Sequence, residues 1–184
     1  GFKVYFGTDN IPTELVTNQA GLAFDISPSN STTYYWRIDA TNEVGGTAPG
    51  DVWSFRTEDP PRGTVQLGAP TYSVNENGGS VTITVTRVDG SFGAASVDYA
   101  TADGTATAGS DYAATNGTLN WTDEDSAAKT FTVSITDDAV VEGNEAFTVS
   151  ISNAVGAILG LPASTTSTVT IVDNEVAAPG TLQF

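Results

Sequence analysis

The chain has 184 residues, a formal net charge of −16, and no Cys, Met or His. Disulfides, zinc–thiolate sites and catalytic Cys or His residues are therefore excluded within it. So strong a negative charge argues against nucleic acid or an anionic membrane surface as a partner, and favours cations. No apolar run approaches the about 18 residues of a membrane helix, so we expect no membrane insertion in this segment.

The first part of the chain alternates apolar and polar residues, which predicts strands rather than helices. Within residues 33–40 the even-numbered positions are apolar and should share one face of a strand. Two prolines, Pro60 and Pro61, then predict a short, stiff linker over residues 59–62. The strands predicted before this linker are residues 2–6, 23–26, 33–40 and 52–57.

The second part of the chain repeats the alternating pattern, with turns of Gly, Asn, Asp and Ser between the runs. Seven short strands in about a hundred residues predict an immunoglobulin-like sandwich. The predicted strands are residues 65–74, 80–88, 95–100, 117–121, 128–136, 146–152 and 166–172.

The end of the chain resembles the start of its second part. Gly180-Thr181-Leu182-Gln183-Phe184 follows the pattern of Gly63-Thr64-Val65-Gln66-Leu67 about one domain length later. We therefore expect residues 177–184 to be a linker and the first strand of a following repeat, in an array whose units contact mainly their neighbours. We interpret the sequence as a segment of a longer protein.

Acidic residues stand in four of the predicted turns: at Glu76, at Asp111, in the run 137–145, and in the run 173–175. If successive strands alternate in direction, all four turns lie at one pole of the sandwich. The acidic turn 123–125 falls at the opposite pole and is expected to be solvated. Carboxylates gathered without a basic residue repel each other, and a divalent cation with oxygen ligands would reverse the sign of that interaction.

Residues 63–175 resemble the Calx-beta family. The motifs that carry the resemblance are the run from Asp103 to Tyr112, Gly117-Thr118-Leu119, Lys129 to Val133, the acidic loop 137–145, and Thr168 to Glu175. The resemblance implies a seven-stranded sandwich that binds Ca²⁺ at one pole. Asn174 interrupts a run that is fully acidic in calcium-sensing members, which suggests fewer or weaker sites. The implied ligands are Glu76, Asp111, Asp138, Glu142, Glu145, Asp173 and the carbonyl of Val140, with Asp137 and Glu175 as additions.

Residues 1–58 resemble the C-terminal part of a fibronectin type III domain, with Tyr34 as its tyrosine corner. The fold class predicted for the whole chain is therefore all-β, with tandem immunoglobulin-like β-sandwiches: a partial domain at 1–58 and a Calx-beta-like domain at 63–176.

Other functions are less favoured for these residues. Mg²⁺ fits the acidic pole less well, because it demands a tight octahedron and keeps its waters. The three Trp residues could stack on carbohydrate, but packing in the sandwich is the stronger expectation. Asp103 is predicted to be a turn residue rather than a ligand. Without His or Cys there is no nucleophile pair, and the acids lie on an exposed pole, so no enzyme activity is expected.

The predicted function is a calcium-binding structural module of a large secreted or cell-surface protein of bacterial origin. It would be part of a stalk, adhesin or filament in which Ca²⁺ stiffens the junction between domains. Partners would be neighbouring domains or protomers, other surface proteins, or glycans. Three alternatives remain: an accessory region of a secreted hydrolase, an intracellular calcium sensor, and a filament subunit that exchanges strands without Ca²⁺.

Overall fold

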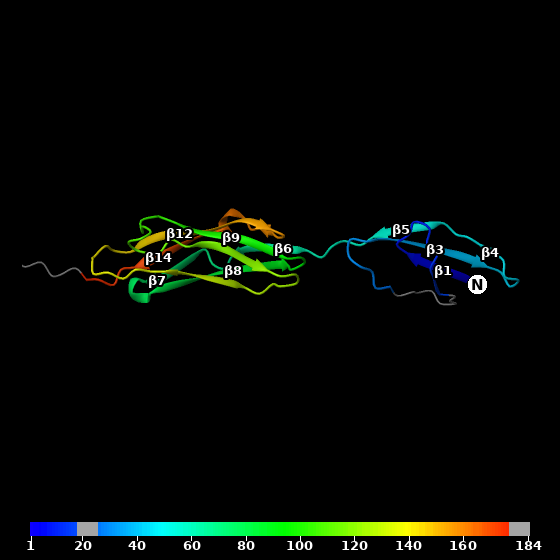
Figure 1. Cartoon of the computed structure of the whole chain (residues 1–184), viewed down its shortest axis with the longest axis horizontal. Coiled ribbons are helices and arrows are strands. Elements are labelled where there is room, and N and C mark those ends of the chain that lie inside the picture. Colours follow the sequence, from blue (N-terminus) through cyan, green and yellow to red (C-terminus); the bar gives the residue numbers. More distant parts are fainter. Residues whose placement is uncertain (18–25, 177–184) are drawn as a thin grey trace, which may run out of the picture. The chain divides into compact units, whose positions relative to one another are not determined.

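The computed structural model describes residues 1–17 and 26–176 (Figure 1). The predicted strand 23–26 lies almost wholly, and the predicted repeat start 177–184 wholly, outside the described residues. The chain divides into two compact units, Gly1–Pro60 (unit 1) and Pro61–Phe184 (unit 2), and the division falls inside the predicted linker. Within the described part, neither of the two short helices is long and apolar enough to cross a membrane.

Unit 1 is built on a five-stranded antiparallel sheet in the order β2-β1-β3-β4, with β5 also paired to β3. The sequence did not predict β2 or β4, which are only three and two residues long. The strands are β1 (Phe2–Gly7), β2 (Leu15–Thr17), β3 (Thr33–Thr41), β4 (Thr47–Ala48) and β5 (Val52–Arg56).

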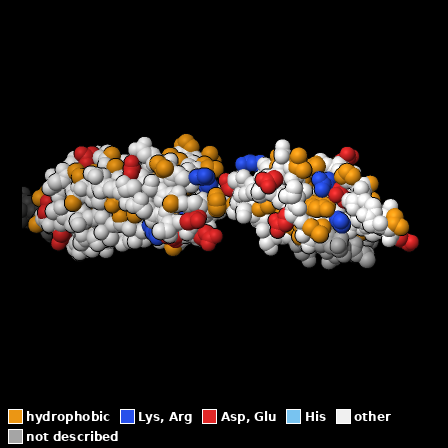
Figure 2. All heavy atoms as spheres, turned by 45° about the vertical axis from the view of Figure 1, so that its right-hand side comes forward, with side chains coloured by type: hydrophobic (Ala, Val, Ile, Leu, Met, Phe, Trp, Pro, Cys, Tyr) orange, Lys and Arg blue, Asp and Glu red, His pale blue; other side chains and the backbone are white. Residues whose placement is uncertain are grey.

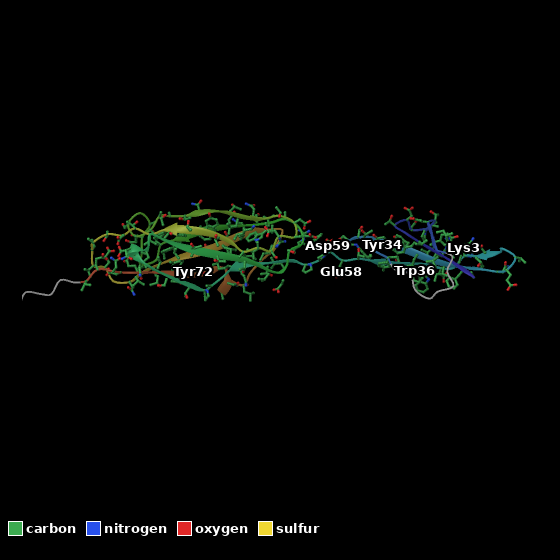
Figure 3. All side chains as sticks on the ribbon, turned by 90° about the horizontal axis from the view of Figure 1, so that it is seen from below. Lys3, Tyr34, Trp36, Glu58, Asp59 and Tyr72 are labelled. Atoms are coloured by element: carbon green, nitrogen blue, oxygen red, sulfur yellow. The ribbon has the colours of Figure 1, made fainter. Side chains whose placement is uncertain are left out.

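The two faces of β3 differ as the alternation predicts. On one face the Tyr34 ring stacks on Phe6 at 4.9 Å, and Trp36 stacks on Trp53 at 6.1 Å between ring centroids. Figure 3 labels Tyr34 and Trp36 on this strand. The Tyr34 hydroxyl also accepts a hydrogen bond from the Ser29 N–H at 2.8 Å, the kind of upstream backbone contact that a tyrosine corner makes.

The opposite face of β3 is polar. The Arg37 guanidinium pairs with Asp39 at 2.7 Å and lies 4.6 Å from the centroid of the Tyr5 ring. The predicted separation of an apolar from a polar face is confirmed.

Unit 2 is a sandwich of two sheets, one in the order β10-β9-β12-β14-β7 and the other in the order β11-β8-β6-β13. Short 3₁₀ helices, η1 (Glu76–Gly78) and η2 (Pro162–Ser164), lie between strands. The strands are β6 (Arg62–Leu67), β7 (Thr71–Asn75), β8 (Ser80–Gly90), β9 (Ala95–Ala102), β10 (Asn116–Trp121), β11 (Lys129–Ser134), β12 (Glu145–Val155), β13 (Ile158–Leu159) and β14 (Thr166–Val172).

The prediction of a single strand over residues 65–74 is wrong. The segment crosses from one sheet to the other, so that β6 pairs with β8 while β7 pairs in parallel with β14. The crossing lies at Gly68 and Pro70: Gly68 donates to the Thr84 carbonyl at 2.8 Å, and the Pro70 carbonyl accepts from Thr168 at 3.1 Å. Proline has no N–H to give to a continuing ladder, so the first sheet ends there. Together with the unpredicted β13, this crossing replaces the seven predicted strands by sheets of five and four.

The core of unit 2 lies between these two sheets. It is formed by inward residues of both, and aromatic pairs span it: Tyr99 stacks on Phe131 at 3.8 Å, and Tyr112 on Phe147 at 4.1 Å. Trp121 is only 2% exposed, and its indole N–H donates to the Ala127 carbonyl at 2.8 Å. Its expected role in packing is therefore confirmed.

A buried arginine organises the pole of unit 2 at which β6 begins. Arg87 is 3% exposed, and its guanidinium donates to the backbone carbonyls of Arg62, Phe92, Gly93 and Asp125 at 2.6–3.3 Å. These bonds join the start of β6 to the turns after β8 and β10. The acidic turn 123–125 is therefore at this pole, as the sequence predicts.

Candidate metal centre

The topology brings four loops of unit 2 to its other pole. They are η1 between β7 and β8, the loop between β9 and β10, the loop between β11 and β12, and the segment that follows β14. Antiparallel pairing of β9 with β10 and β12, and parallel pairing of β7 with β14, place these connections at one end. Figure 1 shows the yellow loop before β12 and the red end of β14 at this end of the unit. We call these four connections the acidic pole.

Three groups of carboxylates form at the acidic pole. Within each group, one oxygen from each of three residues lies within 4.8 Å of the others. Two residues are shared: Glu76 belongs to the first and second groups, and Glu142 to the second and third. The groups are Glu76, Asp173 and Glu175; Glu76, Asp138 and Glu142; and Asp111, Glu142 and Glu145.

The structure thus brings seven of the predicted ligands together. The two others, Asp137 and Val140, belong to none of these groups among the described residues. The groups consist of carboxylates only, so the Val140 carbonyl stays a prediction. The Val140 N–H donates to Asp138 Oδ1 at 2.7 Å, which folds the loop back on its own carboxylate.

Glu76 is the most enclosed of these acids, with 7% of its surface exposed. Its Oε1 accepts a long hydrogen bond of 3.4 Å from the Asp138 N–H. The next residue, Asn77, donates its N–H to the Asn174 side-chain oxygen at 3.1 Å. The 3₁₀ turn is therefore tied to two other loops, through Asp138 and through Asn174.

Asp173 connects the segment after β14 to the loop before β12. Its Oδ2 accepts from the N–H groups of Glu142 and Gly143 at 3.1 and 2.6 Å, and its Oδ1 from the Glu175 N–H at 2.9 Å. These bonds, led by that from Glu175, hold the pKa of Asp173 below its usual range. Gly143 has φ +80°, a conformation that L side chains rarely adopt. This role of Gly143 was not predicted from the sequence, although a glycine within an acidic loop was an available signal.

Asp111 is held within its own loop. Its Oδ2 accepts from both the backbone N–H and the hydroxyl of Thr107, at 2.6 and 3.2 Å. Across the loop, desolvation and the charge of Asp111 raise the pKa of Glu145, and desolvation and the charges of Asp138 and Asp111 raise that of Glu142.

Glu175 shows most plainly that a positive charge fits this pole. Its Oε2 is buried and has no hydrogen-bond donor among the described residues, although Asn174 donates to its Oε1 at 2.8 Å. The neighbouring Asp173 carboxylate, desolvation and the charge of Glu76 raise the pKa of Glu175 to about 7. A cation would replace the missing donor.

The donor set defines the kind of ion. All side chains in the three groups are carboxylates, which suit a hard cation. The ion pairs of the described residues, Arg37–Asp39 and Lys129–Asp125, lie elsewhere. In the stick view, red oxygen atoms gather at the end of unit 2 beyond β14 (Figure 3). The space-filling view shows acidic side chains at both ends of this unit (Figure 2), so convergence rather than acidity marks the site.

Fold and site together define the class: an immunoglobulin-like sandwich whose loops gather carboxylates for a hard cation at one pole. A model of the Calx-beta domain matches residues 58–175. The chain therefore belongs to the Calx-beta family, and the resemblance seen in the sequence is confirmed. Calx-beta domains are non-catalytic modules that bind Ca²⁺, the ion that the sequence predicts.

Among known proteins, the chain is similar to sodium/calcium exchangers. It is 35% identical over 137 residues to sodium/calcium exchanger 1 of Rattus norvegicus, a match that covers 65% of this chain and 14% of the exchanger. It is 42% identical over 83 residues to exchanger 3 of Homo sapiens, covering 45% of this chain and 9% of the exchanger. The chain thus spans a small fraction of the length of these curated relatives.

The chain is also similar to solved structures of Calx domains. The apo-form Calx CBD1 domain superposes with a TM-score of 0.56 at 32% identity, covering 60% of this chain and 96% of that domain. The calcium binding domain CBD12 of CALX1.1 superposes with the same TM-score and identity, covering 60% of this chain and 45% of that one. No such finding tests the fibronectin type III assignment of unit 1, which stays a prediction.

Proposed function

We propose that unit 2 binds Ca²⁺ at the acidic pole, and that the chain is a structural module of a larger multidomain protein in which the ion stiffens a domain junction. The observation that carries this proposal is the convergence of seven carboxylates into three groups that share Glu76 and Glu142. The buried oxygen of Glu175, which has no donor, supports it independently.

The ion acts by neutralisation and by cross-linking. Without it, like charges within a few ångströms of each other oppose folding of the pole. With ions bound, the first group joins η1 to the segment after β14 and the second joins η1 to the loop before β12, connections that are otherwise held by a few hydrogen bonds. Because Glu76 and Glu142 are shared, binding in one group positions a ligand of the next, so the ions should bind cooperatively. An ion present at about 100 times its Kd stabilises the fold by about 2.7 kcal/mol.

Ca²⁺ fits this arrangement better than Mg²⁺. Calcium accepts six to eight oxygens in flexible geometry, whereas magnesium requires a tight octahedron and gives up its waters reluctantly. Three loops and a chain segment that approach from different directions provide many oxygens without octahedral order.

The stiffening role rests on the segment that follows β14. This segment contributes Asp173 and Glu175 to the first group and directly follows β14, the last strand of the described residues. An ion held there fixes the direction in which the chain leaves the sandwich. In a tandem array this would set the angle to the next unit, as a secreted or cell-surface stalk, adhesin or filament requires.

The similarity to sodium/calcium exchangers favours a second candidate, a calcium-sensing region of a transporter. The two functions differ in the affinity that they need. A structural module in calcium-rich surroundings works with a Kd of about 0.1–1 mM, whereas a sensor needs about 0.1–10 µM. The secreted or cell-surface setting and the bacterial origin are part of our proposal, with the structural module as the preferred function.

Calorimetric titration of the metal-free chain with Ca²⁺ tests the proposal. The informative variant is Asp138→Asn combined with Glu142→Gln, because the amides keep size and the Val140 hydrogen-bond acceptor. Asp123→Asn combined with Glu124→Gln is the matched control: it removes the same charge at the opposite pole and keeps the oxygen that accepts from Gly93.

We expect the wild type and the control to bind Ca²⁺ saturably and in preference to Mg²⁺. The variant with Asp138→Asn and Glu142→Gln should bind Ca²⁺ more weakly. Equal loss in both variants, or no heat at millimolar Ca²⁺, would refute a site at this pole.

A further inference from the structure

Asp103 does more than complete a turn. A single oxygen of its carboxylate, Oδ1, accepts two hydrogen bonds, from the Tyr112 hydroxyl at 2.6 Å and from the Ala108 N–H at 2.9 Å. The two donors lie nine and five residues further along the chain. These bonds, led by that from Tyr112, hold the pKa of Asp103 below its usual range, so the acceptor is ionised at neutral pH. Asp103 belongs to none of the three carboxylate groups of the described residues.

Tyr112 is a rigid partner for this carboxylate. Only 1% of it is exposed, and its ring stacks on Phe147 at 4.1 Å with an interplanar angle of 11°. Its backbone bridges to Ile135, the residue directly after β11. Burial and the Asp103 carboxylate raise the pKa of Tyr112 to about 12, so its hydroxyl keeps the donated proton throughout the physiological range.

The two residues close residues 103–112 into a loop, which we call the latch loop. Inside it, the Thr107 N–H and hydroxyl both donate to Asp111 Oδ2, and Asp111 directly precedes Tyr112. The Asp111 carbonyl accepts from the Thr136 N–H at 2.9 Å. The predicted ligand Asp111 is therefore fixed from both sides, by Thr107 next to Ala108 and by the anchored Tyr112.

The latch loop is also tied to the strand that carries another ligand. Thr105 Oγ1 accepts from the Ala146 N–H at 2.8 Å, and the Ala106 N–H donates to the Ala146 carbonyl at 2.9 Å. Ala146 follows Glu145, a member of the group that contains Asp111. The loop therefore sets the position of Asp111 relative to Glu145 before any ion arrives.

We propose that Asp103 and Tyr112 are positioning residues that preorganise Asp111 for the group with Glu142 and Glu145, without touching the ion themselves. This inference rests on the proposed calcium binding. Its physical basis is that ordering a ligand costs affinity unless the ordering exists beforehand, and that outer partners of metal ligands are worth about 10- to 100-fold in metal affinity.

Three variants of the full chain separate positioning from coordination. Tyr112→Phe keeps the stacked ring and removes the donor. Asp103→Ala removes the acceptor. Asp103→Asn removes the charge but keeps an oxygen that can accept both bonds, so it should rescue a hydrogen-bonding role and fail to rescue a metal ligand. Tyr72→Phe is the matched control, because it removes a tyrosine hydroxyl that is hydrogen-bonded to the backbone of Thr84, away from the latch loop.

Each variant is titrated with Ca²⁺ by calorimetry, and amide hydrogen exchange at Thr107 and Ala108 is measured without metal. We expect Tyr112→Phe and Asp103→Ala to weaken the affected binding step about tenfold or more and to speed exchange at both amides. Asp103→Asn and Tyr72→Phe should stay within about threefold of the wild type.

Two results would overturn the latch alone while the wild type still binds Ca²⁺. One is unchanged affinity in Tyr112→Phe and Asp103→Ala; the other is an equal loss in Asp103→Asn and Asp103→Ala, which would make Asp103 a ligand. If Tyr112→Phe does not fold, the two Asp103 variants still distinguish a positioning residue from a metal ligand. A wild type that binds no Ca²⁺ would overturn the proposed function and this inference together.

Discussion

Replacing Glu76 by Gln should change the stability of unit 2 in opposite directions with and without Ca²⁺. Glu76 belongs to two of the three carboxylate groups and is 7% exposed. Its charge contributes to the raised pKa values of Glu142, Glu145 and Glu175. Gln keeps the shape and the oxygen that accepts from Asp138, but removes the charge.

The magnitude follows from linkage. If each ion binds with a Kd of about 0.1 mM, the tight end of the range for a structural module, 1 mM Ca²⁺ stabilises the fold by about 1.4 kcal/mol per ion. When loss of one carboxylate weakens binding about 10- to 100-fold, the stabilisation that remains is about 0.4 kcal/mol or less per ion. Over the two groups that contain Glu76, the stability lost is about 2–3 kcal/mol, or about 6–12 °C in Tm for a domain of this size. Without metal, the variant should melt slightly above the wild type, because one repelling charge is gone.

Differential scanning calorimetry in chelator and in 1 mM Ca²⁺ measures the Tm difference between the variant and the wild type in both conditions. Glu124→Gln, the same chemical change on the turn at the opposite pole, is the control and should shift Tm little in either condition. A Glu76→Gln variant that gains as much stability from Ca²⁺ as the wild type does would refute the reasoning, because Glu76 would then hold no ion.

Three further predictions follow from the same structure. Without metal, unit 2 should lose stability as pH rises from about 4.5 to about 7. The folded pole holds more protons than the unfolded chain there, because the pKa values of Glu142, Glu145 and Glu175 are raised, and urea unfolding at several pH values measures this. Asn174→Asp should tighten Ca²⁺ binding in calorimetry but lower the metal-free Tm, since it adds a charge and removes the donor to Glu175; weaker binding would contradict this. Arg87→Ala should cost about 3–5 kcal/mol in urea unfolding, because several buried carbonyls lose their donor, and should leave the Ca²⁺ Kd unchanged.

The convergence of the acids could be predicted from the sequence because it depends only on strand direction. Alternating runs fix the number of reversals between Glu76, Asp111 and Asp173, and each reversal moves the chain to the other pole. Local errors in strand ends do not change that result. The pole was therefore predictable even though the strand over residues 65–74 was wrong.

The sheet crossing left two signals in the sequence. The inward positions are odd-numbered at Val65 and Leu67 but even-numbered at Tyr72 and Val74, so the alternation shifts by one residue between the two halves of the segment. Pro70 was the second signal, since it cannot donate to a ladder in the middle of a sheet. Arg87 also left a signal, because it occupies an inward position in line with Val81, Ile83 and Val85.

The contacts within the acidic pole could not be predicted from the sequence. The backbone donors to Asp173, the orphaned oxygen of Glu175 and the latch at Asp103 depend on loop conformations that no periodic pattern encodes. The sequence indicates which acids meet, whereas the structure shows how they divide into groups and which residues hold them in place.

The most direct test of calcium binding at the acidic pole is an assigned ¹⁵N-resolved NMR titration of the metal-free chain with Ca²⁺. We expect the amide shifts to concentrate at residues 76–78, 107–112, 137–145 and 173–176, to saturate with Ca²⁺, and not to be reproduced by an equal concentration of Mg²⁺. Shifts centred on residues 123–125, or an unchanged spectrum at millimolar Ca²⁺, would contradict calcium binding at this pole.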